Sequence, residues 1–121
     1  MRQREDLTLV LKLFFYGTLM DRQILRSVAG DDILGRFLGD AILKDYQAFY
    51  VLDEDYPVLQ PKPGMEVRGH LYLVATKDEL DRLMAYEGDE YVLGPIKTSL
   101  GDAKAFLPSS LVEVSDLPWK S

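Results

Sequence analysis

The stretch F-F-Y-G-T-L, at residues 14–19, brings an apolar run to a stop on a glycine and a hydroxyl side chain. Residues 9–16 are rich in Leu, Phe and Val, and Lys12 is the one charged residue among them. A short apolar run of this kind is typical of a strand that is covered on both faces. We therefore predict a central strand at residues 9–16 that ends where Gly17 begins a turn.

The turn at the end of this strand is a candidate binding loop. A break at Gly17 exposes the consecutive backbone N–H groups of Gly17, Thr18 and Leu19, a concavity that can hold a carboxylate or phosphate. The Thr18 hydroxyl adds a donor, and glycine lets a ligand approach the backbone closely. The alternative is an ordinary turn between a strand and a helix. The stretch is not a P-loop, because it lacks the second glycine and the Gly-Lys-Ser/Thr signature.

Two short helices are expected among several strands. Asp21 precedes apolar residues at helical spacing, and Gly30 predicts the end of that helix. Thr76 and Glu79 form a capping box for a second helix, which should run to about Tyr86. Further strands are predicted at residues 35–43, 46–52, 58–60, 67–74, 91–100, 103–107 and 111–114. Turns or loops should separate them at residues 44–45, 53–57 and 61–64.

Within the strand predicted at residues 67–74, Gly69 indicates a bulge or a close backbone approach. Strands with two short helices indicate an α+β domain, built on a barrel-like or open mixed sheet. We expect a single domain over residues 1–121, with residues 1–8 as a polar leader.

The second helix places a carboxylate on its apolar face. Leu80, Leu83, Met84 and Glu87 stand at positions i, i+3, i+4 and i+7, so Glu87 shares the stripe expected to pack inward. Burial and the negative end of the helix dipole would both raise the pKa of this carboxylate. A carboxylate tuned in this way can act as a general acid/base near neutral pH. The alternative is that Glu87 turns out to water where Gly88 ends the helix.

Composition excludes several classes of function. The net charge of −6 and the pI near 4.7 argue against nucleic acid and anionic membranes as partners. The absence of cysteine excludes disulfides, thiolate metal sites and cysteine nucleophiles, and permits a reducing compartment, of which the cytoplasm is the simplest. No apolar stretch approaches the length of a membrane span. His70 is the one histidine and has no obvious second ligand, so no metal is expected.

Four motifs together resemble the gamma-glutamylcyclotransferase-like superfamily, in the branch of small gamma-glutamylamine cyclotransferases and plant avirulence-induced proteins. The motifs are F-F-Y-G-T-L, Y-P-V-L-Q-P-K-P-G, V-R-G-H-L-Y-L-V and L-D-R-L-M-A-Y-E-G-D-E-Y. They span about Leu13 to Tyr91, and S-D-L-P-W gives a looser echo near the end. The resemblance implies a small mixed-sheet β-barrel with short helices and a cavity.

The resemblance also implies site residues. Tyr16, Gly17, Thr18 and Leu19 would bind the glutamyl end of a substrate, and Glu87 would be the general acid/base. Tyr91 would line the same pocket and orient Glu87 or the substrate. The sequence departs from the family pattern at Met20, where a basic or polar residue is frequent, and in the longer spacing of L-D-R-L-M-A-Y-E-G.

The implied reaction is cyclisation of a gamma-glutamyl amine or amino acid to 5-oxoproline, with release of the amine and without a cofactor. The partner would be the small-molecule substrate, and the sequence leaves the oligomeric state open. Two other functions stay open. One is a non-catalytic small-ligand-binding protein of the same fold, in which Glu87 only hydrogen-bonds a ligand amine. The other is a protein-binding module, which would have no ligand-sized cavity near Tyr16 and Glu87.

Overall fold

The computed structural model describes residues 10–119 of the 121-residue chain. The predicted polar leader at residues 1–8 therefore lies outside the described residues. The described strands are β1 (Leu11–Phe15), β2 (Phe37–Val51), β3 (Pro57–Val74), β4 (Tyr91–Thr98), β5 (Gly101–Pro108) and β6 (Val114–Pro118). The helices are α1 (Arg22–Ala29) and α2 (Lys77–Glu87), with short 3₁₀ helices at Thr18–Met20 and Asp32–Arg36.

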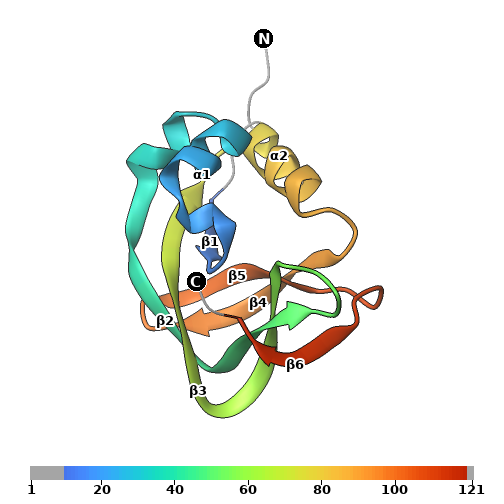
Figure 1. Cartoon of the computed structure of the whole chain (residues 1–121). Coiled ribbons are helices and arrows are strands. Elements are labelled where there is room, and N and C mark those ends of the chain that lie inside the picture. Colours follow the sequence, from blue (N-terminus) through green and yellow to red (C-terminus); the bar gives the residue numbers. More distant parts are fainter. Residues whose placement is uncertain (1–9, 120–121) are drawn as a thin grey trace.

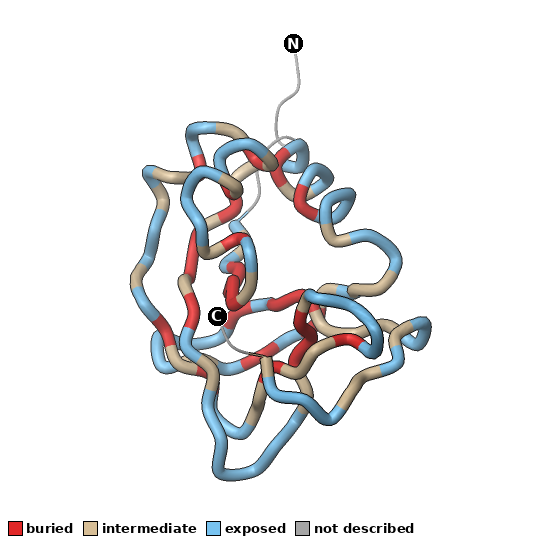
Figure 2. Tube along the Cα trace, viewed as in Figure 1, coloured by how far each residue is buried: buried red, intermediate tan, exposed pale blue. Residues whose placement is uncertain are grey.

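Strand β1 is covered on both faces, as its sequence predicts. Leu13 and Phe15 belong to one buried cluster, whereas Phe14 and Tyr16 belong to another. Successive side chains of a strand point to opposite faces, so the apolar run supplies two cores at once. Figure 2 shows β1 as a buried segment in the middle of the molecule.

Five strands close into a barrel (Figure 1). Strand β1 pairs antiparallel with β3 and parallel with β5, and β5 pairs antiparallel with β4. Strand β2 pairs antiparallel with both β4 and β3, which completes the ring. Strand β6 adds to the far end of β2. The predicted α+β fold, a small mixed-sheet barrel with short helices, is confirmed.

The barrel and the helices have separate cores. One cluster fills the barrel and draws on all five of its strands, including Phe14, Leu43, Leu59, Ile96 and Ala105. The other cluster lies between the barrel wall and the helices. It joins Phe15 and Tyr72 of the sheet to Leu25 of α1 and Leu83 of α2. Each helix packs on the barrel wall through one apolar stripe, so a short helix is sufficient.

The predicted break between residues 43 and 46 is wrong. Strand β2 runs through it as one strand, and β3 likewise runs through the turn predicted at residues 61–64. Asp45 adopts a φ of 66° and its carboxylate accepts a hydrogen bond from the backbone N–H of Gly64. The pairing shifts from Lys44–Glu66 to Tyr46–Pro61 at this point. The local turn signals therefore produce a bulge inside a long hairpin, because pairing on both sides carries the strands onward.

The other predicted element boundaries lie closer to the observed ones. The helix caps at Asp21, Gly30 and Thr76 are as predicted. Residues 35–36, predicted as the start of a strand, end the 3₁₀ helix Asp32–Arg36, and β2 begins at Phe37. The last strand is β6 at Val114–Pro118 and not residues 111–114, because it extends along the end of β2 after a turn.

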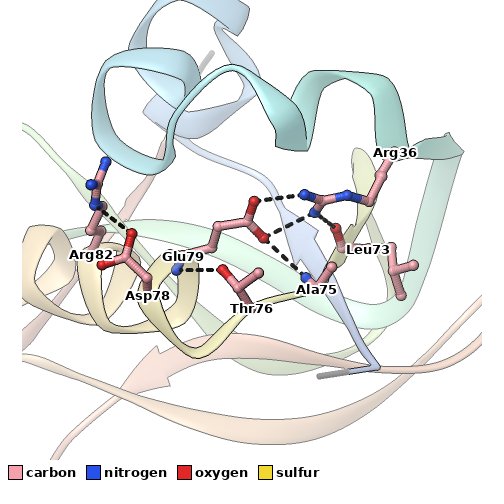
Figure 3. Close-up of polar contacts among 7 residues, drawn as sticks. All are labelled: Arg36, Leu73, Ala75, Thr76, Asp78, Glu79 and Arg82. Atoms are coloured by element: carbon pink, nitrogen blue, oxygen red, sulfur yellow. Dashed lines mark hydrogen bonds and ion pairs between the residues drawn. The ribbon is translucent and has the colours of Figure 1, made fainter. Parts of the chain in front are cut away.

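An ion pair holds the first turn of α2 (Figure 3). Both guanidinium Nη atoms of Arg36 donate to the Glu79 carboxylate, at 2.9 and 2.7 Å. Glu79 also accepts from the backbone N–H of Ala75, and its own backbone N–H donates to the Thr76 hydroxyl. The Thr76 hydroxyl therefore caps the helix as predicted, and the Glu79 carboxylate also binds Arg36 and the Ala75 N–H. Burial is the largest single influence on the pKa of Glu79 and raises it, but the hydrogen bonds to the carboxylate and the Arg36 charge together outweigh burial, so the pKa is lowered.

Candidate active site

A cavity of about 480 Å³ opens between the loop after β1, the end of α2 and the starts of β3 and β4. Its lining contains every residue that the sequence singled out: Tyr16, Gly17, Thr18, Leu19, Glu87 and Tyr91. These residues come from the two sequence regions, 16–19 and 87–91, that lie about 70 positions apart along the chain. The parallel β1–β5 pairing and the docking of α2 bring them together.

The loop at one side of the cavity leaves backbone donors unused. Residues 18–20 form a single 3₁₀ turn, in which the N–H groups of Met20 and Asp21 donate to the carbonyls of Gly17 and Thr18. Within residues 10–119, the N–H groups of Gly17, Thr18 and Leu19 have no hydrogen-bond partner. A Cβ atom at Gly17 would contact Pro57, another lining residue, at 3.4 Å. The geometry can therefore hold an anionic group against the backbone.

Leu19 can contribute only its backbone N–H group to binding, because its side chain is apolar. Leu19 is buried in the cluster between barrel and helices, where its side chain packs. Its burial fixes the turn in place. Thr18, by contrast, is exposed at the rim.

Glu87 is the last residue of α2 and lines the same cavity. Burial raises the pKa of its carboxyl group to about 7. In the part of the chain that the structure describes, this carboxylate has neither a hydrogen-bond nor an ion-pair partner. A carboxylic acid with this pKa can both accept and return a proton near neutral pH.

The inward face of α2 differs from the prediction at one position. Glu79, Leu83 and Glu87 follow one another at i, i+4 and i+8, and Glu79 and Leu83 are buried. Met84, which was predicted on the same stripe, is 48% exposed. At 3.6 residues per turn Glu87 lies between Leu83 and Leu80 around the helix, whereas Met84 lies about 40° beyond Leu80, toward solvent.

Tyrosine hydroxyls brace the walls of the cavity. Tyr91 donates to the Pro57 carbonyl at 2.6 Å, Tyr56 donates to the Glu90 carboxylate at 2.7 Å, and Tyr16 donates to the Phe106 carbonyl at 3.1 Å. Burial is the main cause that raises the pKa of Tyr16 and of Tyr91, and the Glu87 charge adds to both shifts. The Glu90 hydrogen bond raises the pKa of Tyr56 to about 12.

These contacts constrain the role predicted for Tyr91. Its hydroxyl is bonded to the Pro57 carbonyl and not to Glu87. The Tyr91 ring nevertheless lines the cavity close enough to Glu87 for their charges to interact. An orienting effect of Tyr91 on Glu87 would therefore be exerted through packing.

Four further polar residues line the cavity beyond the predicted site residues: Asp55, Tyr56, Tyr86 and Glu90. Tyr86 and Glu90 flank Glu87 in the quoted A-Y-E-G-D-E-Y motif, and Tyr56 begins Y-P-V-L, so their nearness to the motifs was the available signal. Among residues 10–119, the lining holds three carboxylates, Asp55, Glu87 and Glu90, and no lysine, arginine or histidine. The cavity therefore favours a cationic group at its carboxylate side.

His70 lies outside this cavity. Its Nε2 atom is 3.4 Å from an Asp40 carboxylate oxygen, and its ring meets Phe37 edge-on. The described residues contain no group of three or more histidine, cysteine or acidic side chains that could hold a metal ion. No helix within residues 10–119 has the length and apolar character to span a membrane.

Comparison with known proteins decides the family. A family model described as gamma-glutamyl cyclotransferase, AIG2-like, matches residues 13–115. The chain belongs to this family. The match includes both the loop after β1 and the end of α2, which contribute residues to the cavity lining.

Relatives of this cyclotransferase-family chain agree in sequence and in fold. AIG2-like protein A from Arabidopsis thaliana is 32% identical over 81 residues, which are 65% of this chain and 46% of that protein. The chain thus spans about half the length of this curated relative. A solved structure titled gamma-glutamyl cyclotransferase has a TM-score of 0.72 at 18% identity, with 88% of this chain and 70% of that chain covered.

An uncharacterised protein from Pyrococcus horikoshii gives a TM-score of 0.65 at 22% identity, with 91% of this chain and 86% of that chain covered. At these identities the structural likeness establishes a shared fold. The family-model match confirms the predicted superfamily.

Proposed function

We propose that the protein is an enzyme that cyclises a gamma-glutamyl amine or gamma-glutamyl amino acid to 5-oxoproline and releases the amine. The family match supports the general class. The observation that carries the proposal is that Glu87, with a pKa raised to about 7, faces the same cavity as the unused backbone donors of residues 17–19.

The binding loop would hold the α-carboxylate of the glutamyl group. The N–H groups of Gly17, Thr18 and Leu19 would donate to its oxygens, and the Thr18 hydroxyl would add a donor at the rim. The α-ammonium group, on the same carbon atom, would then point toward the carboxylate side of the cavity. Glu87 would lie within reach to receive a proton from it.

The chemistry balances without a co-reactant. Glu87 takes a proton from the α-ammonium group, and the freed amine attacks the side-chain amide carbon, forming the ring C–N bond. The tetrahedral intermediate then collapses: the bond to the leaving nitrogen breaks as Glu87 returns a proton to that nitrogen, and the ring nitrogen gives up its second proton to water. The products are 5-oxoproline and the free amine, and Glu87 is restored. Much of the rate would come from holding the amine and the carbonyl in reacting geometry.

The negative charge of the cavity affects which leaving group is preferred. Asp55 and Glu90 line the same cavity as Glu87, and within the described residues no basic side chain lines it. A leaving group with a positive charge would be attracted, whereas an additional carboxylate near this side would be repelled. Within the glutamyl class, we therefore expect amines to be turned over more efficiently than acidic amino acids.

The test is release of 5-oxoproline from a panel of gamma-glutamyl amines and gamma-glutamyl dipeptides, with wild type and Glu87→Gln at equal folded concentration. The proposal expects turnover of at least one class by the wild type and loss of about 100-fold or more in the variant, the size of a general acid/base contribution. Thermal-shift binding of the same compounds should be retained in Glu87→Gln.

Two outcomes would change the conclusion. Saturable binding without any turnover by the wild type would favour a non-catalytic ligand-binding protein of the same fold. Neither binding nor turnover on any member of the panel would exclude the glutamyl class.

A further inference from the structure

The rim of the cavity is bridged by one hydrogen bond. The Thr18 Oγ1 atom and the Tyr86 hydroxyl oxygen are 2.7 Å apart, although the residues are separated by 68 positions in the sequence. Thr18 belongs to the loop after β1, and Tyr86 lies in the last turn of α2, directly before Glu87. Both side chains line the cavity and both are exposed.

We propose that this hydrogen bond is a clasp that holds the end of α2 against the binding loop, and that Tyr86 is thereby a positioning residue for Glu87. The positioning role rests on the proposed function, whereas the effect of the clasp on the surroundings of Glu87 does not. Nothing in the sequence motifs had assigned Tyr86 a part in the site.

The clasp lies at the last turn of α2, the part of the helix that is most prone to fray. Helix ends fray, because their last carbonyls lack partners inside the helix. The last turn of α2 has no basic residue to bind those carbonyls, and its cap is the bond from the Gly88 N–H to the Met84 carbonyl. Among the hydrogen bonds of residues 10–119, the Thr18–Tyr86 bond is the one that joins this turn to the binding loop.

Apolar packing lies beneath the clasp. Leu19 of the loop and Leu83 of α2 belong to the same buried cluster. The fold of this region is therefore secured by the core, and the clasp acts on the rim above it. A variant without the Tyr86 hydroxyl should fold, while its last helical turn and the Glu87 carboxylate gain access to water.

The two hydroxyls of the clasp can also donate to a substrate. Each hydroxyl has one proton to donate, and one of the two protons is used within the pair. One hydroxyl proton is therefore left over for a ligand. The clasp can stay closed while it offers this proton to a carboxylate held by the loop.

The first test needs no substrate. Glu87 is titrated by NMR with isotopically labelled glutamate in wild type, Tyr86→Phe, Thr18→Val and the double variant. The groups that line the cavity with Glu87 and can affect its titration are Tyr16, Asp55, Tyr56, Tyr86, Glu90 and Tyr91. Tyr50→Phe is the matched control, since Tyr50 is not part of the cavity lining.

We expect each single substitution to lower the pKa of Glu87 by roughly one unit, because water then reaches the carboxylate. The double variant should show the same shift as either single one, since both remove the same bond. Tyr50→Phe should leave the titration unchanged. An unchanged Glu87 titration in Tyr86→Phe, or shifts that simply add in the double variant, would overturn the clasp.

The second test uses turnover. Tyr86→Phe should lower kcat about tenfold, the order of one hydrogen bond, with the acid limb of the kcat profile moved to lower pH. KM should change less than kcat, because the backbone donors of the loop remain. If the wild type turns over no glutamyl compound, the proposed function fails, while the titration still decides the clasp. Wild-type kcat in Tyr86→Phe would overturn the positioning role.

Discussion

Arg36 and Glu79 form a two-pronged ion pair between the 3₁₀ helix before β2 and the first turn of α2, with N–O distances of 2.9 and 2.7 Å. The Glu79 side chain is 7% exposed and the Arg36 side chain 23% exposed. Arg36 also donates to the Leu73 carbonyl at the end of β3. The pair therefore fixes the start of α2 on the barrel, eight residues before Glu87.

Glu79→Gln should destabilise the protein by about 3 kcal/mol, because it leaves the Arg36 charge partly buried without its counterion. Urea unfolding at pH 7 measures the loss. The control is Asp81→Asn, which breaks the exposed Lys77–Asp81 pair and should cost less than about 1 kcal/mol. Since the pKa of Glu79 is lowered by folding, its contribution is present above the ordinary glutamate value of 4.5 and is lost as pH falls below it. Equal losses in the two variants would show that burial of the pair is unimportant.

Gly69→Ala should destabilise the protein by about 2 kcal/mol or more. A Cβ atom at this position would lie 2.4 Å from the Phe15 carbonyl oxygen and 2.6 Å from the Phe14 ring, so the barrel would have to open at β1 and β3. The thermal midpoint measures the effect. Gly35→Ala is the matched control, since its Cβ atom would meet nothing within 4 Å, and a similar loss there would contradict the packing argument.

Glu87→Gln should change stability in a pH-dependent way. Folding raises the pKa of Glu87 from 4.5 to about 7, so its ionisation opposes folding, and wild-type stability falls as pH rises through this window. Below pH 4.5 the variant and the wild type should be alike. Above pH 7 the variant should be more stable by about 3 kcal/mol.

Chemical unfolding at pH 4, 6 and 8 measures the difference in free energy of unfolding between Glu87→Gln and wild type. Glu66→Gln, on the exposed part of β3, is the control for loss of one carboxylate. The prediction fails if Glu87→Gln differs from wild type by the same amount at each pH.

Tyr16→Phe should lower stability by about 1 to 2 kcal/mol, since the buried Phe106 carbonyl loses the hydroxyl that donates to it. Calorimetric or urea unfolding measures this loss. Binding of glutamyl compounds should change little, because the hydroxyl already has a partner and the loop N–H groups are unaffected. A large loss of binding with unchanged stability would instead assign the hydroxyl to the ligand.

Local sequence determined much of this protein. The apolar run at residues 9–16 identified β1, and Asp21, Gly30 and Thr76 identified helix caps, because strand periodicity and capping depend on residues close together in the chain. The same local reasoning placed Glu87 on the inner side of α2 and found the turn at Gly17. The motifs identified the family, and with it the closed mixed-sheet barrel.

Other features were decided only by the tertiary structure. The continuity of β2 and β3 through Asp45 and Gly64 depends on pairing between strands, which overrides local turn signals. The partners of Glu79, Tyr16 and Tyr86 come from segments 43, 90 and 68 positions away. A hydrogen bond of this kind forms only after barrel closure and helix docking have brought both groups together. The sequence thus determined which residues could form the site, and long-range packing decided which of them lie around one cavity and in what surroundings.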